Sequence, residues 1–255
     1  MERTIFKRYE NKYLISQEQY DFILPLLLEH TKLDDYCADN QSYFINNIYF
    51  DTQYNSIIRQ SLAKPEYKEK LRLRGYQLFS QPEDAVFLEL KKKYQGVVYK
   101  RRVGMSYQEA LNLVEKNIKP IREDYQDQQI IEEIAYFVHT NEIKKHLYMN
   151  YQRIALSGIN QPDLRITFDK DIYYHYEKDV SKNLLSDNTY LLEIKTSTSL
   201  PIWLVNTLSA LQIYQISFSK YGKIYAQSLP AYSYDLTFNI NGSFKSAMKG
   251  SWQYV

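Results

Sequence analysis

Charged side chains at alternate positions are the feature of this 255-residue chain best suited to chemistry. Three segments carry them as follows: Lys68, Lys70, Arg72 and Arg74; then Glu89, Lys91 and Lys93; then Glu193 and Lys195. Arginine and lysine neutralise phosphate oxygens, and carboxylates together with phosphates hold Mg²⁺ or Mn²⁺. The residue types therefore predict a site for a polyphosphorylated ligand and a divalent metal.

Strands are the elements that position such residues, because a β-strand turns alternate side chains to opposite faces. In each segment leucine or isoleucine lies opposite the charged positions. The segment around Glu10 and Lys12 has tyrosine and isoleucine opposite them, with Asn11 as a polar exception, and the segment from Arg165 to Asp169 has leucine, isoleucine and phenylalanine. Five segments spread along the chain thus have one charged face and one apolar face. Further strands are predicted at 43–51, 97–103, 147–156, 171–176 and 216–220, where β-branched and aromatic residues dominate.

Helices are predicted between these strands. Ser16 with Gln19, and Ser106 with Glu109, have the spacing of a capping box, in which the serine oxygen accepts from the first turn. These boxes predict helices from residue 16 to about 30 and from 106 to about 117, and two more are predicted at 128–144 and 201–212.

The arrangement predicts an α+β fold, a closed antiparallel eight-stranded β-barrel that forms a tunnel with flanking helices. Such a barrel has room for side chains or one small ligand, so charges that point inward must be neutralised. A bound polyanion would neutralise the cations. Residues 1–229 are predicted to form one tunnel domain, and residues 230–255 a tail with extra strands or little order.

Composition excludes several other classes of protein. The 32 Lys and Arg residues nearly balance 30 Asp and Glu, which is unlike a nonspecific nucleic-acid binder, so no nucleic-acid partner is expected. Cys37 is the only cysteine, which excludes an internal disulfide and favours a reducing, cytoplasmic location. No apolar run approaches the roughly 20 residues of a transmembrane segment. Neither glycine-rich phosphate loop occurs, so side chains must hold the phosphates.

An ordered set of short motifs resembles one known family. The matching pieces are Arg8-Tyr-Glu-Asn-Lys-Tyr13, Ile48-Tyr-Phe-Asp-Thr52, Leu71-Arg-Leu-Arg-Gly-Tyr76, Leu88-Glu-Leu-Lys91, Tyr151-Gln-Arg-Ile-Ala155, Leu192-Glu-Ile-Lys195 and Phe218-Ser-Lys-Tyr-Gly222. From about Phe6 to Gly222 the chain resembles the VTC-type polyphosphate polymerase domain of the triphosphate tunnel metalloenzymes. Lys12 stands where the thiamine-triphosphatase and adenylate-cyclase branch has a second glutamate, which argues against a cyclase or a simple triphosphatase.

The resemblance implies roles for individual residues. It implies that seven cations are catalytic and contact phosphates: Lys12, Arg72, Arg74, Lys91, Arg153, Lys195 and Lys220. Further members of the phosphate site are Lys70, Glu89, Ser219 and one of Arg101 and Arg102, between which strand alternation does not choose. Glu193 would be the principal ligand of Mn²⁺ or Mg²⁺, with Glu10 and Glu89 acting through water.

By resemblance, the reaction is transfer of the γ-phosphoryl group of ATP to polyphosphate, with release of ADP. Two alternatives stay open. A metal-dependent triphosphatase would use the same cations but admit water. A non-catalytic polyphosphate sensor would serve a partner, such as a membrane protein bound through residues 144–146.

Overall fold

A computed structural model describes residues 5–6, 9–37, 42–95, 97–176 and 179–229. The strands are β1 (Ile5–Phe6), β2 (Tyr9–Ser16), β3 (Thr31–Leu33), β4 (Tyr43–Asp51), β5 (Tyr67–Gly75), β6 (Ala85–Tyr94), β7 (Val97–Ser106), β8 (Lys144–Gly158), β9 (Arg165–Tyr176), β10 (Lys182–Asn183) and β11 (Thr189–Thr196). The helices are α1 (Gln17–Leu28), α2 (Ser56–Leu62), α3 (Tyr107–Lys116), α4 (Tyr125–Asn141), α5 (Ile202–Ala210) and α6 (Lys220–Ser228), with a short 3₁₀-helix η1 (Asp35–Cys37). Arg8 and the tail 230–255 lie outside the described residues.

All eleven strands belong to one antiparallel sheet, with the order β1-β7-β6-β5-β4-β8-β9-β11-β2. β10 pairs with β9, and β3 pairs with β8. The prediction of a closed eight-stranded barrel was wrong for the part of the chain that is described, where no ladder joins the outer strands β1 and β2. A closed barrel would require one N-terminal strand to form hydrogen bonds with both β7 and β11. Instead residues 5–6 pair with β7, while residues 9–16 pair with β11.

Most predicted strands are present, and two differ. Segments 165–169 and 171–176 form the single strand β9, which continues through Asp171 at φ 52°. Segment 216–220 is not a strand: Ile216 makes an isolated bridge to Lys12, and Lys220 begins α6. The reason is the Ser219 hydroxyl, which accepts a hydrogen bond from Gly222 N and starts a helix.

The two predicted capping boxes are confirmed. The Ser16 oxygen accepts from Gln19 N at 3.1 Å, and the Gln19 side chain accepts from Ser16 N at 3.1 Å. Ser106 and Glu109 make the same pair of bonds before α3. Helix α4 ends at Asn141, before the predicted limit of 144, because Lys144 already belongs to β8.

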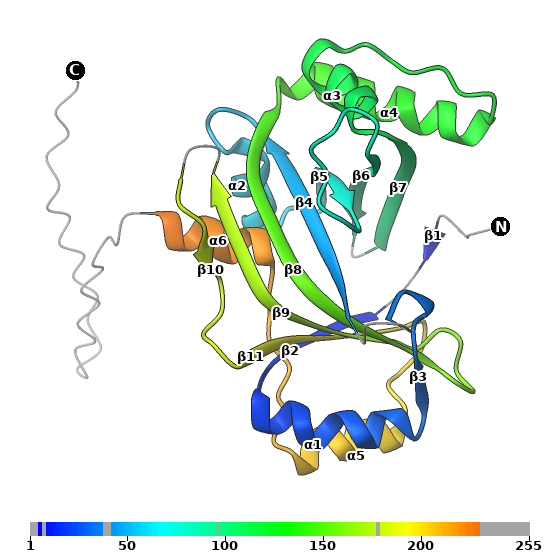
Figure 1. The fold of residues 1–255 in the computed structure, drawn as a ribbon, viewed down its shortest axis with the longest axis vertical. Helices are drawn as coiled ribbons and strands as arrows, with labels where there is room; N and C mark the ends of the chain where they lie inside the picture. The colour runs from blue at the N-terminus through cyan, green and yellow to red at the C-terminus, as the bar shows by residue number, and fades with distance from the viewer. Residues whose placement is uncertain (1–4, 7–8, 38–41, 96, 177–178, 230–255) are drawn as a thin grey trace, which may run out of the picture.

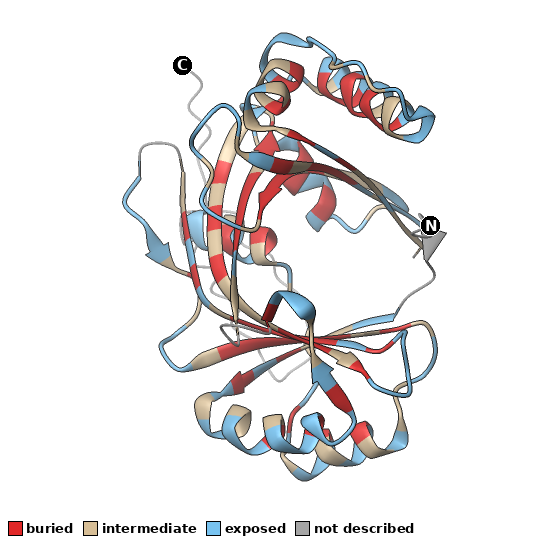
Figure 2. Ribbon diagram, turned by 45° about the vertical axis from the view of Figure 1, so that its right-hand side comes forward, coloured by how far each residue is buried: buried red, intermediate tan, exposed pale blue. Residues whose placement is uncertain are grey.

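Two layers of helices cover the outer side of the curved sheet (Figure 1). Helices α3 and α4 bury the apolar faces of β5, β6 and β7, and α1 and α5 bury those of β2, β9 and β11. The helix layers lie at opposite ends of the molecule, with the sheet bending between them (Figure 2). Because the leucine and isoleucine positions face these helices, the alternate charged positions face the other side of the sheet, here called the inner face.

A third apolar cluster lies on the inner face, where α6 packs against the sheet. Tyr221 and Ile224 of α6 are buried with Met149, Ile172 and Leu191 from three strands. Helix α6 therefore covers part of the inner face, and its first residue, Lys220, comes to the edge of the charged part. No helix among the described residues is long and apolar enough to cross a membrane.

Candidate functional site

Three buried carboxylates organise the inner face, and each collects several cations. The first is Glu89 of β6, of which only 1% is exposed. Arg72 Nε lies 2.6 Å from Glu89 Oε2, and Lys100 Nζ and Arg102 Nε lie 2.8 and 3.5 Å from Oε1. The register β5·β6·β7 puts Arg72, Glu89 and Arg102 side by side. One carboxylate thus faces three cations.

The second carboxylate is Asp169 of β9, which is fully buried. Arg153 of β8 donates two hydrogen bonds to it, from Nε to Oδ1 at 2.6 Å and from Nη2 to Oδ2 at 2.7 Å. Lys220 Nζ, at the start of α6, reaches Oδ2 at 2.5 Å. Asp169 therefore joins α6 to the sheet, and its single negative charge is shared by two cations.

Glu193 of β11 is the third carboxylate, and it contacts lysines of two strands. Lys195 forms an ion pair with Oε1, and Lys12 Nζ lies 3.6 Å from Oε2. Lys12 also lies 2.9 Å from Glu10, whose other oxygen is 3.9 Å from Lys91 Nζ. Since Lys91 belongs to β6 and Glu10 to β2, this contact crosses from one half of the sheet to the other.

Arg74 and Tyr151 lie beside the Asp169 group. Arg74 donates to Asn47 Oδ1 at 3.0 Å and to the Tyr151 hydroxyl at 3.2 Å, and the Lys220 ammonium lies 4.5 Å from the centre of the Tyr151 ring. The contacts of the inner face connect ten of its cations with four carboxylates: Glu10, Glu89, Asp169 and Glu193, with Lys12, Lys70, Arg72, Arg74, Lys91, Lys100, Arg102, Arg153, Lys195 and Lys220. Such an excess of positive charge in one place favours a polyanion as ligand.

Electrostatic forces on the inner face shift several pKa values. Burial alone would raise the pKa of Glu10, and Glu193 adds to that, but Lys91, Lys195 and Lys12 together lower it to about 2. Burial opposes ionisation of Glu193 also, yet the surrounding cations hold its pKa well below the ordinary value. The carboxylates are therefore ionised at neutral pH and available to a metal.

Burial and neighbouring cations lower the pKa of several inner-face lysines and so favour their neutral form. Burial, with repulsion from Lys68 and Lys91, lowers the pKa of Lys70 to about 8. Burial also lowers the pKa of Lys100 to about 8, although Glu89 counteracts part of the shift. Without a bound anion, the inner face holds more positive charge than its carboxylates neutralise.

Comparison with known proteins identifies the family. A family model described as the VTC domain matches residues 7–229. The chain belongs to this family. No curated protein sequence matches the chain.

The fold of this VTC domain is shared with a solved protein of low sequence identity. An adenylate cyclase candidate from Bacillus halodurans is 16% identical, with a TM-score of 0.54, 85% of this chain and 96% of that one covered. An adenylyl cyclase candidate from Hippeastrum, described as having a dominant triphosphatase activity, is 15% identical over 88% of this chain and 98% of that one, with a TM-score of 0.48. At these identities the first likeness shows the fold alone.

Most residues predicted for the site in the VTC domain are brought together on the inner face. Arg102 contacts Glu89, whereas Arg101 points to the outer side, where it forms an ion pair of 3.0 Å with Glu133 of α4. Strand alternation did not choose between these two arginines, and the structure places only Arg102 on the inner face. Ser219 caps α6, as described above, and Lys70 lies 6.0 Å from the ring of Tyr221.

Four inner-face residues were not predicted as site members. Lys100 and Asp169 lie an even number of residues from Arg102 and Arg165, so strand alternation could have predicted them as members of the site. Tyr151 and Asn47 carry no charge, and only the tertiary contacts with Arg74 reveal them. Charge alternation therefore finds ionic members of the site but misses neutral ones.

A divalent metal fits the chemistry of Glu10 and Glu193. The two carboxylates are near enough that each disfavours ionisation of the other, a repulsion that a cation would remove. No group of three or more His, Cys, Asp or Glu side chains that could hold a metal occurs in the described ranges. Mg²⁺ needs only one or two carboxylates where substrate phosphates and water supply the other oxygens. A metal held here would thus bind together with the phosphate ligand.

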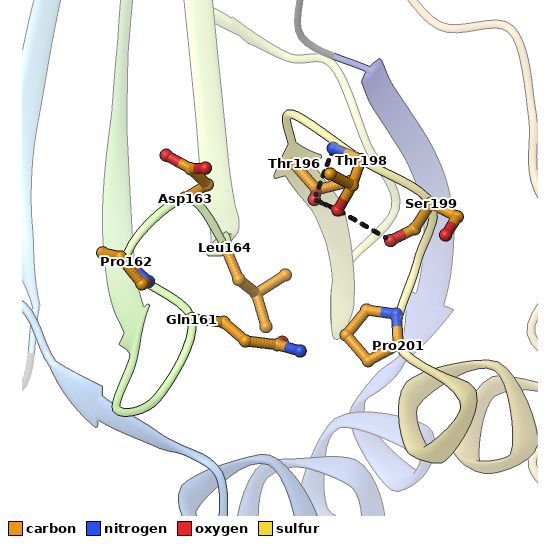
Figure 3. A pocket seen from close by; sticks show the side chains of 8 residues that line it. All are labelled: Gln161, Pro162, Asp163, Leu164, Thr196, Thr198, Ser199 and Pro201. Carbon is orange, nitrogen blue, oxygen red and sulfur yellow. Dashed lines mark hydrogen bonds between the residues drawn. The ribbon is translucent and has the colours of Figure 1, made fainter.

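A small cavity elsewhere does not compete for this role. It measures about 130 Å³ and lies between the β8–β9 and β11–α5 loops (Figure 3). Asp163 is the one charged residue in its lining, and its carboxylate accepts from Ser197 at 2.6 Å. A cavity whose one charged lining residue is a carboxylate does not favour phosphate.

The 144–146 segment does not form the basic surface expected for a membrane-protein partner. Lys145 Nζ is 2.8 Å from Glu115 Oε1, and the His146 ring packs 5.1 Å from that of Tyr176. Of these three residues only Lys144 is exposed. A single exposed lysine gives no support to such a partner.

Asp169→Asn is expected to destabilise the ligand-free protein strongly. Loss of the carboxylate charge leaves Arg153 and Lys220 buried without a counter-ion, which costs about 3–5 kcal/mol for a broken buried pair. Thermal unfolding with and without tripolyphosphate measures the effect. Because the added anion replaces the lost charge, it should restore more stability to the variant than to the wild type. Equal stabilisation of both would contradict this role for Asp169.

Proposed function

We propose that this VTC domain is a metal-dependent polyphosphate polymerase that transfers the γ-phosphoryl group of ATP to polyphosphate and releases ADP. The observation that carries the proposal is the cluster of ten cations with four carboxylates on one face of the sheet. Membership of the VTC family supports the same substrate class. A chain of phosphates would fill the face and compensate its charge.

Phosphoryl transfer needs positioning and neutralisation of charge more than covalent help. Arg72, Arg74 and Arg153 present forked guanidinium groups that bind phosphate oxygens at fixed angles. Glu89, Asn47 and Asp169 orient these three arginines through the bonds described above. The arginines are therefore held in place before the ligand binds, which reduces the cost of ordering them during the reaction.

The lysines of β2, β6, β11 and α6 would add point charges along the ligand: Lys12, Lys91, Lys195 and Lys220. Glu193 would hold Mn²⁺ or Mg²⁺, with Glu10 helping, and the bound metal would neutralise charge on the transferred phosphoryl group. The Thr167 hydroxyl lies beside Glu193 in the strand register, is buried, and has no hydrogen-bond partner among the described residues. It is available to donate to a ligand.

A metal-dependent triphosphatase is the second candidate, and solvent access favours it. The side chains of Lys91 and Lys100 are 49% and 42% exposed, so water reaches the cations of the site. Hydrolysis uses the same charges but takes water as the acceptor in place of a phosphate chain.

One pair of incubations tests the function. With ATP and Mn²⁺, the polymerase is expected to form long-chain polyphosphate that is visible on a gel. With tripolyphosphate and Mn²⁺, a triphosphatase releases free phosphate instead. Strong thermal stabilisation by tripolyphosphate without either product would identify a sensor and contradict the polymerase proposal.

Binding of a polyphosphate is expected to weaken as the pH rises through about 8. Lys70 and Lys100, with pKa values of about 8, are each about half neutral at that pH in the free protein. A bound polyanion raises both pKa values, so binding takes up protons, and a higher pH opposes it. Calorimetry in two buffers of different ionisation enthalpy measures the number of protons taken up on binding. Lys100→Met should reduce it relative to the wild type, while protons of the ligand itself affect both proteins equally.

A further inference from the structure

A rim of three tyrosines borders the charged inner face. Tyr36 comes from η1, Tyr43 from the start of β4, and Tyr76 follows β5. The rings of Tyr36 and Tyr76 are stacked, with centroids 5.6 Å apart and planes 14° apart. Tyr43 lies 5.9 and 6.0 Å from these two rings. We call these residues the tyrosine rim.

Position along β4 separates the rim from the Tyr49–Tyr221 contact. Tyr43 and Tyr49 are on the same face of β4, six residues apart, which corresponds to roughly 20 Å. Tyr49 contacts Tyr221 of α6, with centroids 5.1 Å apart, whereas Tyr43 contacts the rim. Asn47, between them, lies at the Arg74 part of the site. Along β4 the Arg74 part of the site thus lies between the tyrosine rim and the Tyr49–Tyr221 contact. Lys220, the first residue of α6, lies nearer the rim, because Asp169 pairs it with Arg153 beside Tyr43.

Two arginines connect the rim to the phosphate site. Arg102 Nη2 donates to the Tyr76 hydroxyl at 3.1 Å, while its Nε faces Glu89 and has no hydrogen-bond partner in the described part of the chain. Arg153 is the direct neighbour of Tyr43 in the β4·β8 register. A ligand that placed a phosphate near Arg102 and Arg153 would therefore have its next group at the tyrosine rings.

Packing alone does not account for the rim. Tyr36 is 67% exposed, so most of its ring remains in contact with solvent despite its two aromatic neighbours. Arg102 adds a guanidinium 3.6 Å from the centre of the Phe87 ring, beside Tyr76. An inorganic polyphosphate has no group that gains from aromatic contact. An aromatic base does, because any nucleobase stacks on tyrosine and on an arginine plane.

We propose that the tyrosine rim binds the base of a nucleoside triphosphate whose phosphates lie along the cations of the inner face. The proposal rests on the function proposed above and assigns a binding site to the base of its nucleotide donor. The tyrosine rings would stack on the face of the base. Stacking does not distinguish the hydrogen-bonding groups on the edge of one base from those of another. Purine nucleoside triphosphates should consequently bind with similar affinity.

The test compares ATP with inorganic tripolyphosphate in the full chain. Tyr36→Ala is expected to weaken ATP binding about 10-fold or more and to leave tripolyphosphate binding unchanged, as measured by calorimetry. Tyr36→Phe should keep both affinities, since stacking needs the ring and not the hydroxyl. Tyr136→Ala is the matched control, because that tyrosine is 73% exposed on α4 and away from the rim. In Tyr36→Trp, ATP but not tripolyphosphate should change the added fluorescence.

The outcomes separate this inference from the proposed function. Equal weakening of ATP and tripolyphosphate by Tyr36→Ala, or no weakening of either, would overturn the base-binding role. A wild-type protein that binds tripolyphosphate but not ATP would overturn both the base-binding role and phosphoryl transfer from ATP, and only the polyanion site would stand. If the wild-type protein binds neither compound, the proposed function itself fails.

Discussion

Glu193→Gln is expected to reduce metal-dependent turnover about 100-fold or more while the chain still folds. In the described part of the chain, Glu193 is the inner-face acid that is both buried and next to a second carboxylate, Glu10, so it is the best ligand for a divalent metal. Glutamine keeps the shape of the side chain but donates no negative charge to a metal. Without that charge the metal would not hold the transferred phosphoryl group.

Binding experiments distinguish this role from a structural one. The variant should bind metal-free tripolyphosphate at least as tightly as the wild type, because Lys12 and Lys195 lose their counter-charge and become free for phosphate. Addition of Mn²⁺ should tighten binding only in the wild type. Glu133→Gln is the matched control, since Glu133 also pairs with two cations, Lys92 and Arg101, but on the outer side. Full turnover in Glu193→Gln would remove the metal role.

Arg72→Ala should lower kcat/KM for ATP about 1000-fold, with a higher KM and a lower kcat. Arg72 is held by Glu89 at 2.6 Å, so its remaining guanidinium nitrogens are pre-oriented for a phosphate. Removal loses contacts made in both the bound substrate and the transition state. Glu89 keeps Lys100 and Arg102 as partners, so the fold should survive.

Arg101→Ala is the matched control for Arg72→Ala. Both arginines form an ion pair with a glutamate, but Arg101 does so with α4 on the outer side. Its removal should leave kcat/KM unchanged. Arg72→Lys should recover part of the activity, because a lysine restores the charge but not the fork. A loss in Arg101→Ala as large as that in Arg72→Ala would show that the inner face has no special role.

The sequence predicted which residues gather, because strand alternation is a local rule. Once Leu71, Leu73, Leu88 and Leu90 face helices, their charged neighbours must face the other side. Capping boxes at Ser16 and Ser106 are likewise local, since the donor and acceptor are three residues apart. These features did not depend on how distant parts of the chain meet.

The predictions that were wrong depended on pairing between distant segments. Closure of the sheet depended on whether the N-terminal segment could bond to two strands at once, and it divides between β7 and β11 instead. The segment 216–220 has the residue types of a strand, but Lys12 offers it only one bridge before Ser219 starts α6. Long-range contacts override local propensity in both places.

By itself the sequence determined the charged faces, the helix starts and the motifs that resemble the VTC family. Only the tertiary structure decided which of Arg101 and Arg102 joins the site, that Asp169 anchors Arg153 and Lys220, and that three tyrosines form a rim. The physical reason is that alternation fixes the side of a strand on which a residue lies. The partner it meets there depends on register and on segments far away in the chain.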